Sequence, residues 1–207
     1  AANVAGFTPI ELMKQVSLQT NALMKRKSAV FHDEIIPALK NSGIEFVLWN
    51  QIDETERGYV TKLFQDRIFP VLTPLAVDPS HPFPYISGLS LNLAVIVKNP
   101  TSHEEFFARV KVPEILPRFI ATAKSGSTRF LPLEELIAIH LQDLFPGMII
   151  EDHYTFRITR NQDMDLDEEE SEDILTSIEQ ELARRRFGPP VRLEIENGVD
   201  EKLVEKL

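Results

Sequence analysis

The sequence of 207 residues contains no cysteine, and this absence excludes disulfide bonds, thiolate metal ligands and cysteine nucleophiles. Glycine is scarce as well, and the eight glycines form neither a phosphate-binding loop of a known type nor the elbow of serine hydrolases. No apolar run approaches the length of a membrane-spanning helix, and no basic region followed by an apolar stretch opens the sequence. These absences favour a soluble cytoplasmic protein and leave the chain without a complete catalytic constellation.

Basic residues are in the minority, and the net charge is −10. The excess of acid is local, because residues 1–70 carry eight charges of each sign, whereas eight acidic residues lie within 163–173. Without that block, residues 71–207 hold 14 basic and 16 acidic side chains. The overall acidity therefore does not exclude an anionic ligand elsewhere on the chain.

Proline is concentrated in one place, with five prolines within residues 70–84, here called the proline segment. Because proline fixes one backbone angle and lacks an amide donor, this segment is expected to be neither a helix nor a central strand. It nevertheless carries the apolar side chains Val71, Leu72, Leu75, Val77 and Phe83. We interpret it as a rigid, extended and buried connection between two folded units.

Helical signals dominate the residues before the proline segment. Thr8, Pro9 and Glu11 combine a cap, a proline at the first helical position and a capping box, and Gly43 is a suitable terminator. Between them we expect either one long helix or a helical hairpin broken near residues 25–28. Asp53 begins a second helix with the same capping pattern, and residues 44–49 are a candidate for a short strand.

After the proline segment, apolar and polar residues alternate in four segments: 91–97, 106–112, 153–159 and 191–195. This period predicts four strands, each with one buried face. Helices are expected at residues 132–144 and 168–186, and a short one from residue 200.

The expected fold class is therefore α+β, with an N-terminal helical hairpin or bundle followed by a mixed or antiparallel sheet domain with packed helices. We place the helical domain at residues 1–68 and the second domain at residues 69–207, with the proline segment leading into it.

Three patterns that imitate functional sites are better explained structurally. Residues 163–167 resemble the start of a calcium loop, but Glu168 and Ile174 stand where glycine and glutamate are needed. The arginines at 184–186 would point in three directions on a helix, so they complement its C-terminus rather than form one phosphate clamp. The five histidines lack the spacing of a zinc site. Of these, His81 in the proline segment is the best placed for a capping or hydrogen-bonding role.

Basic side chains occupy the polar faces of the predicted strands: Arg109, Lys111, His153, Arg157 and Arg192. If these strands are neighbours with their faces aligned, the side chains form one basic, anion-binding surface. On the residues alone we favour the alternative, in which they solvate an exposed face and pair with Glu194 and Glu196.

Several segments together resemble the large bacterial polyphosphate kinases, the type that is phosphorylated on its own histidine. The main resemblance lies in FPVLTPLAVDPSHPFP at residues 69–84 and LSLNLAV at residues 89–95. Four further stretches agree in the same order: FARVKVP at 107–113, LFPGM at 144–148, FRITRN at 156–161 and RRRFG at 184–188. Together they span nearly the whole chain.

The resemblance implies that the chain carries the end of the family's helical N-terminal domain and its head, or middle, domain. The intact enzyme would transfer the terminal phosphoryl group of ATP reversibly to polyphosphate, through a phosphohistidine and with Mg²⁺. The segment that carries this histidine is absent here. We therefore expect no catalytic, cofactor-binding or metal-binding residues in this chain, and no transferase activity from it alone.

The partners that the resemblance implies are the catalytic domains of the same polypeptide, further copies in a homodimer or higher homo-oligomer, and polyphosphate, but no nucleic acid. The location would be cytoplasmic, with membrane association of the parent protein left open. Since a channel for a polyanion needs basic side chains, the candidate channel residues are Arg109, Lys111, His153, Arg157 and Arg160. The alternative function is a stand-alone interaction module without enzymatic activity.

Overall fold

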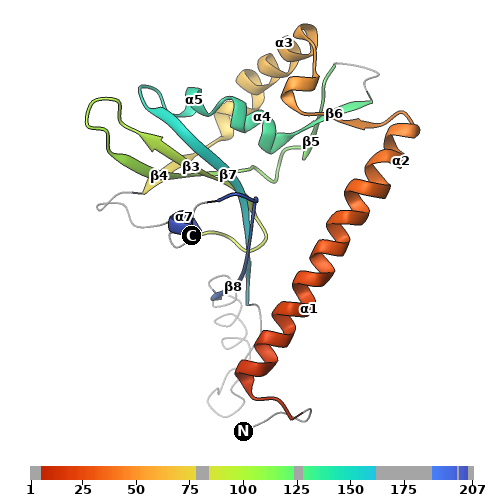
Figure 1. Ribbon diagram of the computed structural model, residues 1–207. Coiled ribbons are helices and arrows are strands. Elements are labelled where there is room, and N and C mark those ends of the chain that lie inside the picture. The colour runs from red at the N-terminus through yellow and green to blue at the C-terminus, as the bar shows by residue number, and fades with distance from the viewer. Residues whose placement is uncertain (1–5, 78–83, 124–127, 162–187, 200, 205–207) are drawn as a thin grey trace, which may run out of the picture.

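The computed structural model describes residues 6–77, 84–123, 128–161, 188–199 and 201–204. Within these ranges a long N-terminal helix leads to a small mixed sheet with short helices and to a five-stranded antiparallel sheet (Figure 1). The predicted α+β class is confirmed. The expected helix at residues 168–186, the calcium-like segment, the arginines at 184–186 and His81 lie outside the described residues.

The N-terminal region is one long helix rather than a hairpin. Helix α1 (Pro9–Val30) continues through the π-turn η1 (Phe31–Ile35) into α2 (Ile36–Asn41), without a break near residues 25–28. The predicted capping box is present, since the backbone N–H of Thr8 donates to the Glu11 carboxylate at 2.8 Å. The chain leaves the helix at Gly43, whose φ of +82° suits glycine.

Two π-turns have the same cause, a proline that follows them. In η1, the N–H of Ile36 donates to the carbonyl of Phe31, one residue before Pro37. The turn η3 (Phe64–Ile68) follows α3 (Glu54–Leu63) and lies just before Pro70. A proline cannot donate to the carbonyl four residues earlier, and its ring collides with that group. The wider π-turn moves this carbonyl away, so the helix continues past Pro37.

The small sheet has the order β1-β6-β5, with β1 (Glu45–Phe46) parallel to β6 (Arg129–Pro132) and β5 (Phe119–Ala121) antiparallel to it. Short helices η2 (Trp49–Gln51), η4 (Phe69–Val71), α4 (Leu133–Ile139) and α5 (Leu141–Leu144) complete this part. The strand near residues 44–49 and the helices at 132–144 were predicted. Strands β5 and β6 were not.

The large sheet has the order β2-β4-β3-β7-β8, and all its pairs are antiparallel. The four strands predicted from the alternation of apolar and polar residues are confirmed: β3 (Leu91–Lys98), β4 (Glu105–Lys111), β7 (Ile149–Arg160) and β8 (Pro190–Ile195). The prediction of one buried face is wrong for β3, where Leu93, Ala94 and Val95 are all fully buried, and for β4, where residues 107–110 are all buried. Both faces of the sheet centre are covered, so neighbouring residues on β3 are buried alike.

Two apolar cores cover the two faces. The larger core joins Val60 and Phe64 of the helical part to Leu93 and Val95 of the sheet and to Leu136 of α4. The smaller core lies on the opposite face and contains Ile86, Ala94, Phe107, Phe156, Ile158 and Leu203. Leu203 belongs to the predicted short C-terminal helix α7 (Glu201–Val204).

The proline segment is only partly the buried connection that we expected. Its residues Pro74–Val77 form β2, an edge strand, where the missing N–H of Pro74 needs no partner. Leu72 is buried, but Val71 and Leu75 are 48% and 38% exposed. The prediction of burial is therefore wrong at these two residues. Leu75 lies on an edge strand, which leaves part of its side chains in water, and Val71 lies in the short helix η4 before that strand. Residues 78–83 lie outside the description.

Candidate functional site

The candidate channel residues on the sheet divide between its two faces. Arg109 of β4 lies opposite Ala94 of β3, and Ala94 lies opposite Tyr154 of β7. His153 and Arg157 neighbour Tyr154 and Phe156 in the chain, and therefore point to the other face. Lys111 shares the face of Arg109, because it lies opposite Asn92 and Asn92 opposite Phe156.

The single basic surface that the sequence suggested is therefore not formed. Residues directly opposite one another in neighbouring strands share a face of the sheet. Through β3, which lies between them, the odd-numbered residues of β4 share a face with the even-numbered residues of β7. Arg192 lies opposite Thr159 and belongs to the face of Arg157. The basic residues thus form two separate groups with different surroundings.

Arg109 is buried, with 7% of its surface exposed. Its Nε donates to Oδ1 of Asn92 at 2.8 Å, and Asn92 is itself held by Ser90. Burial lowers the pKa of the Arg109 guanidinium from its usual value, because a charged group loses its hydration there. Lys111 on the same face contacts Glu114 at 3.0 Å.

Two members of the other group, His153 and Arg157, line a cleft of about 690 Å³ between α1, α4 and the strands β7 and β8. His153 and Arg157 contribute from the sheet, and His32 contributes from the turn after α1. Arg118 and four carboxylates also line it: Glu134, Glu135, Glu194 and Glu196.

Both arginines of the cleft are paired with carboxylates. Arg157 donates from Nε and Nη2 to Oε2 of Glu194, each at 2.9 Å. Arg118 binds both carboxylate oxygens of Glu134, at 2.9 and 2.5 Å. The cleft is consequently acidic, and it is poorly suited to a polyanion.

Arg160 holds backbone segments together. Its Nε donates to the carbonyl of Ile86 at 2.7 Å and its Nη1 to that of Gly188 at 2.8 Å. Its guanidinium also lies 4.4 Å from the centre of the Tyr85 ring. One side chain therefore joins the end of β7 to the residues before β3 and β8.

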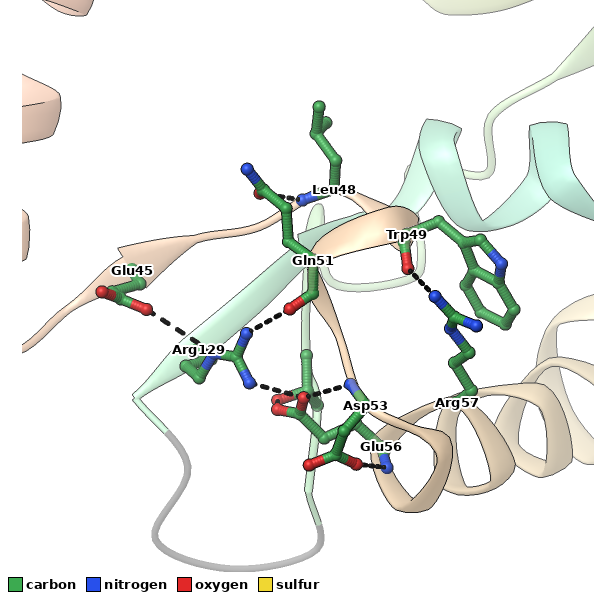
Figure 2. A network of polar contacts seen from close by, with 9 residues as sticks. Glu45, Leu48, Trp49, Gln51, Asp53, Glu56, Arg57 and Arg129 are labelled. Carbon is green, nitrogen blue, oxygen red and sulfur yellow. Dashed lines mark hydrogen bonds and ion pairs between the residues drawn. The ribbon is translucent and has the colours of Figure 1, made fainter.

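Arg129 is the centre of a polar network that the sequence analysis missed (Figure 2). Its guanidinium contacts Glu56 at 2.5 Å, Glu45 at 3.5 Å and the carbonyl of Gln51 at 2.7 Å. Thr122 donates to the second oxygen of Glu56 at 2.6 Å. The network links β1, η2, α3 and β6. Arg129 lies 78 positions after Gln51 and still further after Glu45, so no local pattern could have revealed it.

The environment of Glu56 favours its charged form. Burial alone raises the pKa of this carboxyl, but hydrogen bonds from Thr122 and the Asp53 backbone and the charge of Arg129 outweigh burial and lower it. The sequence assigned Glu56 only to a capping box, and this role is confirmed as well.

The histidines of the described region do not form a metal site. His140 is buried, stacked on Phe64 with ring centres 4.2 Å apart, and its Nδ1 lies 2.9 Å from the Leu136 carbonyl. Among the described residues, no group of three or more histidine and acidic side chains could hold a metal ion. No helix in the described part of the chain is long and apolar enough to cross a membrane.

Comparison with known proteins relates the chain to one family. Residues 55–207 match the model of the polyphosphate kinase middle domain. The polyphosphate kinase of Streptomyces coelicolor is 49% identical over 205 residues, which are 99% of this chain and 27% of that protein. The polyphosphate kinase of Mycobacterium tuberculosis is 50% identical over an alignment of 214 positions, which covers 98% of this chain and 29% of that protein.

The fold also has a counterpart among solved structures. The crystal structure of polyphosphate kinase from Porphyromonas gingivalis matches 93% of this chain with a TM-score of 0.68 and 24% sequence identity. The match covers 29% of that chain. The chain thus spans between 27% and 29% of the length of these relatives.

Proposed function

Because the chain belongs to the polyphosphate kinase family, we propose that it is a non-catalytic part of an enzyme that transfers the terminal phosphoryl group of ATP reversibly to inorganic polyphosphate. The observation that carries this proposal is the match of residues 55–207 to the middle domain of the family. The intact polypeptide would be the enzyme, and the 207-residue chain alone is expected to be inactive.

ATP and Mg²⁺ are proposed to bind to the parts of the polypeptide outside this chain. Phosphoryl transfer depends on positioning and on neutralising charge. The contribution proposed for this chain is accordingly assembly of the enzyme and part of the channel for polyphosphate.

Of the five candidate channel residues, Arg109 has the surroundings best suited to a polyanion, because no carboxylate among the described residues pairs with it. Lys111 shares its face and is paired with the exposed Glu114. His153 and Arg157 line the acidic cleft, and Arg157 is already paired with Glu194. Arg160 uses its guanidinium on two backbone carbonyls. We therefore propose that polyphosphate contacts the large sheet at Arg109 and Lys111, on the face whose centre the smaller apolar core covers.

The assembly role rests on the N-terminal helix. No residue of α1 is buried, although it carries several apolar side chains. We propose that α1 belongs to a helical domain whose other helices, outside this chain, cover it, and that the sheet part takes part in a homo-oligomer. Since Val60, Phe64 and Ile68 share a core with the sheet, we place the division nearer to Gly43 than to residue 68.

The test is a titration of the 207-residue chain with long-chain polyphosphate at low and high salt. Screening of exposed charges predicts that binding weakens at high salt. The Lys111→Ala variant should bind more weakly than the wild type. Lys62→Ala is the matched control, because Lys62 is an exposed lysine in a comparable ion pair with Asp66 on the helical side. Absence of binding at low salt would contradict the channel role.

The second candidate is an interaction module without enzymatic activity, favoured by the exposed apolar side chains of α1. It predicts that the chain binds other protein surfaces through α1 and does not bind polyphosphate. The same titration separates the two functions, because only the first predicts binding of polyphosphate.

A further inference from the structure

Arg109 is a buried cation without an ionic partner among the described residues. It lies on β4 with 7% of its surface exposed, and its Nε donates to Asn92. Within the described part of the chain, this is the one hydrogen bond of its side chain, and no carboxylate there pairs with it. Since a guanidinium carries five N–H donors, the four donors on the two Nη atoms remain for another group.

The orientation of Arg109 is set by a chain of buried hydrogen bonds. Asn92 is fully buried, and its Nδ2 donates to the carbonyl and the Oγ of Ser90 at 2.8 and 3.1 Å. The Oγ of Ser90 donates in turn to the carbonyl of Ser87 at 2.8 Å. Because the amide nitrogen of Asn92 is held, its oxygen is kept for Arg109. The guanidinium is thus positioned before a ligand binds.

The surroundings of Arg109 favour an added anion. A buried cation without a counter-ion is unfavourable, and a negatively charged ligand would relieve this cost. Lys111 lies two residues further along the same face, opposite Asn92, with 39% of its side chain exposed and with its Nζ 3.0 Å from the carboxylate of the exposed Glu114, which an anion could displace. An anion at the Nη atoms would therefore meet a second positive charge close by.

We infer that Arg109 binds a phosphate group, with its Nη donors on the oxygens of one phosphate unit and with Lys111 beside it. The planar guanidinium matches two oxygens of a phosphate, as a lysine cannot. This inference rests on the proposed function and assigns the contact with the phosphate chain to one face of the adjacent strands β4, β3 and β7 (Figure 1). The acidic cleft on the other face is not part of it.

The direct test is NMR of the arginine side chains of the 207-residue chain during titration with pyrophosphate and, separately, with long-chain polyphosphate. The Nε–Hε signal of Arg109, assigned by its loss in Arg109→Lys, should shift and saturate with both anions. The signal of Arg67, an exposed arginine in η3, should stay in place. An Arg109 signal that moves with neither anion overturns the inference.

Affinity for polyphosphate gives a second, independent readout. At low salt, Arg109→Met should bind about tenfold to a hundredfold more weakly, as expected for losing a hydrogen bond between charged groups. Arg109→Lys should lie between this variant and the wild type. Arg67→Met removes the same charge from an exposed site and should change affinity by no more than about twofold. Thermal unfolding of each variant verifies that it is folded.

The outcomes separate this inference from the function on which it rests. Polyphosphate binding of wild-type strength in both Arg109 variants overturns the inference and leaves the proposed function standing. A shift of the Arg109 signal with pyrophosphate, without any binding of polyphosphate, supports the phosphate site and overturns the channel role.

Discussion

At the scale of single residues, Arg129 joins three segments of the chain, and its loss should destabilise the fold. Arg129→Met removes the contacts with Glu45, Glu56 and the carbonyl of Gln51. Because Glu56 is then left with its side chain only 13% exposed and without its cation, we expect a loss of about 2–3 kcal/mol of unfolding free energy. Urea unfolding monitored by circular dichroism measures it.

The matched control is Lys62→Met, which also removes one cation from an ion pair. The side chains of Lys62 and Asp66 are 78% and 58% exposed, so water screens them and the pair contributes little. We expect a change within about 0.5 kcal/mol. Equal losses in the two variants would contradict the role assigned to the Arg129 network.

The lowered pKa of Glu56 predicts how stability depends on pH. A carboxyl whose folded pKa lies below its usual value of 4.5 stabilises the fold above that value, and this contribution is lost as pH falls through the folded pKa. The wild type should therefore lose stability more steeply than Glu56→Gln on going from about pH 5 to about pH 3. Denaturant unfolding at several pH values gives both curves, and parallel curves would refute the prediction.

Sequence reasoning reached the right residue types but not their surroundings. The alternation of polar and apolar residues placed Arg109 and Arg157 on the polar sides of their strands, and both residues are on strands as predicted. It could not show that the two point to opposite faces, because one strand contains no information about its register with the next. Arg109 is buried because the smaller apolar core covers its face of the sheet. That core is a feature of the tertiary structure, which the sequence of one strand does not reveal.

At the scale of secondary-structure elements, Arg160 connects β7 with the chain before β3 and before β8. Arg160→Lys keeps the positive charge but loses the fork that binds the carbonyls of Ile86 and Gly188. We expect a loss of about 1–3 kcal/mol of unfolding free energy. Amide hydrogen exchange should also become faster around residues 85–89 and 188–190.

A channel role for Arg160 predicts a different result, since lysine preserves its charge. Under that role, stability and exchange would stay as in the wild type. Arg67→Lys is the control for the substitution itself, because Arg67 is exposed. Polyphosphate binding by Arg160→Lys close to that of the wild type, together with faster exchange, would confirm the structural role.

The elements with strong local signals were predictable, and the short ones were not. The capping boxes at Thr8 and Asp53 marked helix starts correctly, because their hydrogen bonds lie within three residues. Strands β5 and β6 have three and four residues, too few for a period to appear. They depend instead on pairing with each other and with β1.

At the scale of the whole molecule, one apolar core crosses the predicted domain boundary. Val60 and Phe64 lie before residue 68, but they pack with Leu93 and Leu136 from the sheet part. Composition changes at the proline segment, and this change suggested a division there. Core packing is not visible in composition, so the sequence could not show that Val60 and Phe64 pack against the sheet part. The long helix α1 stands apart from that core (Figure 1).

The exposure of α1 leads to a prediction about assembly. Leu12, Val16 and Leu23 lie on one side of the helix, and they are 37%, 51% and 65% exposed. An apolar stripe of this kind favours association when its natural cover is missing. The 207-residue chain should therefore self-associate with increasing concentration, and Val16→Glu combined with Leu23→Glu should shift it toward the monomer, as measured by sedimentation equilibrium.

The matched control is Gln15→Glu combined with Ala22→Glu, which adds the same charges at the same spacing on another side of α1. This control should associate like the wild type, because it leaves the apolar stripe intact and changes only the charge of the helix. If both double variants become monomeric, general repulsion explains the effect and the apolar stripe does not. If neither changes, association runs through another surface, and the proposal that further helices of the polypeptide cover this stripe loses its physical basis.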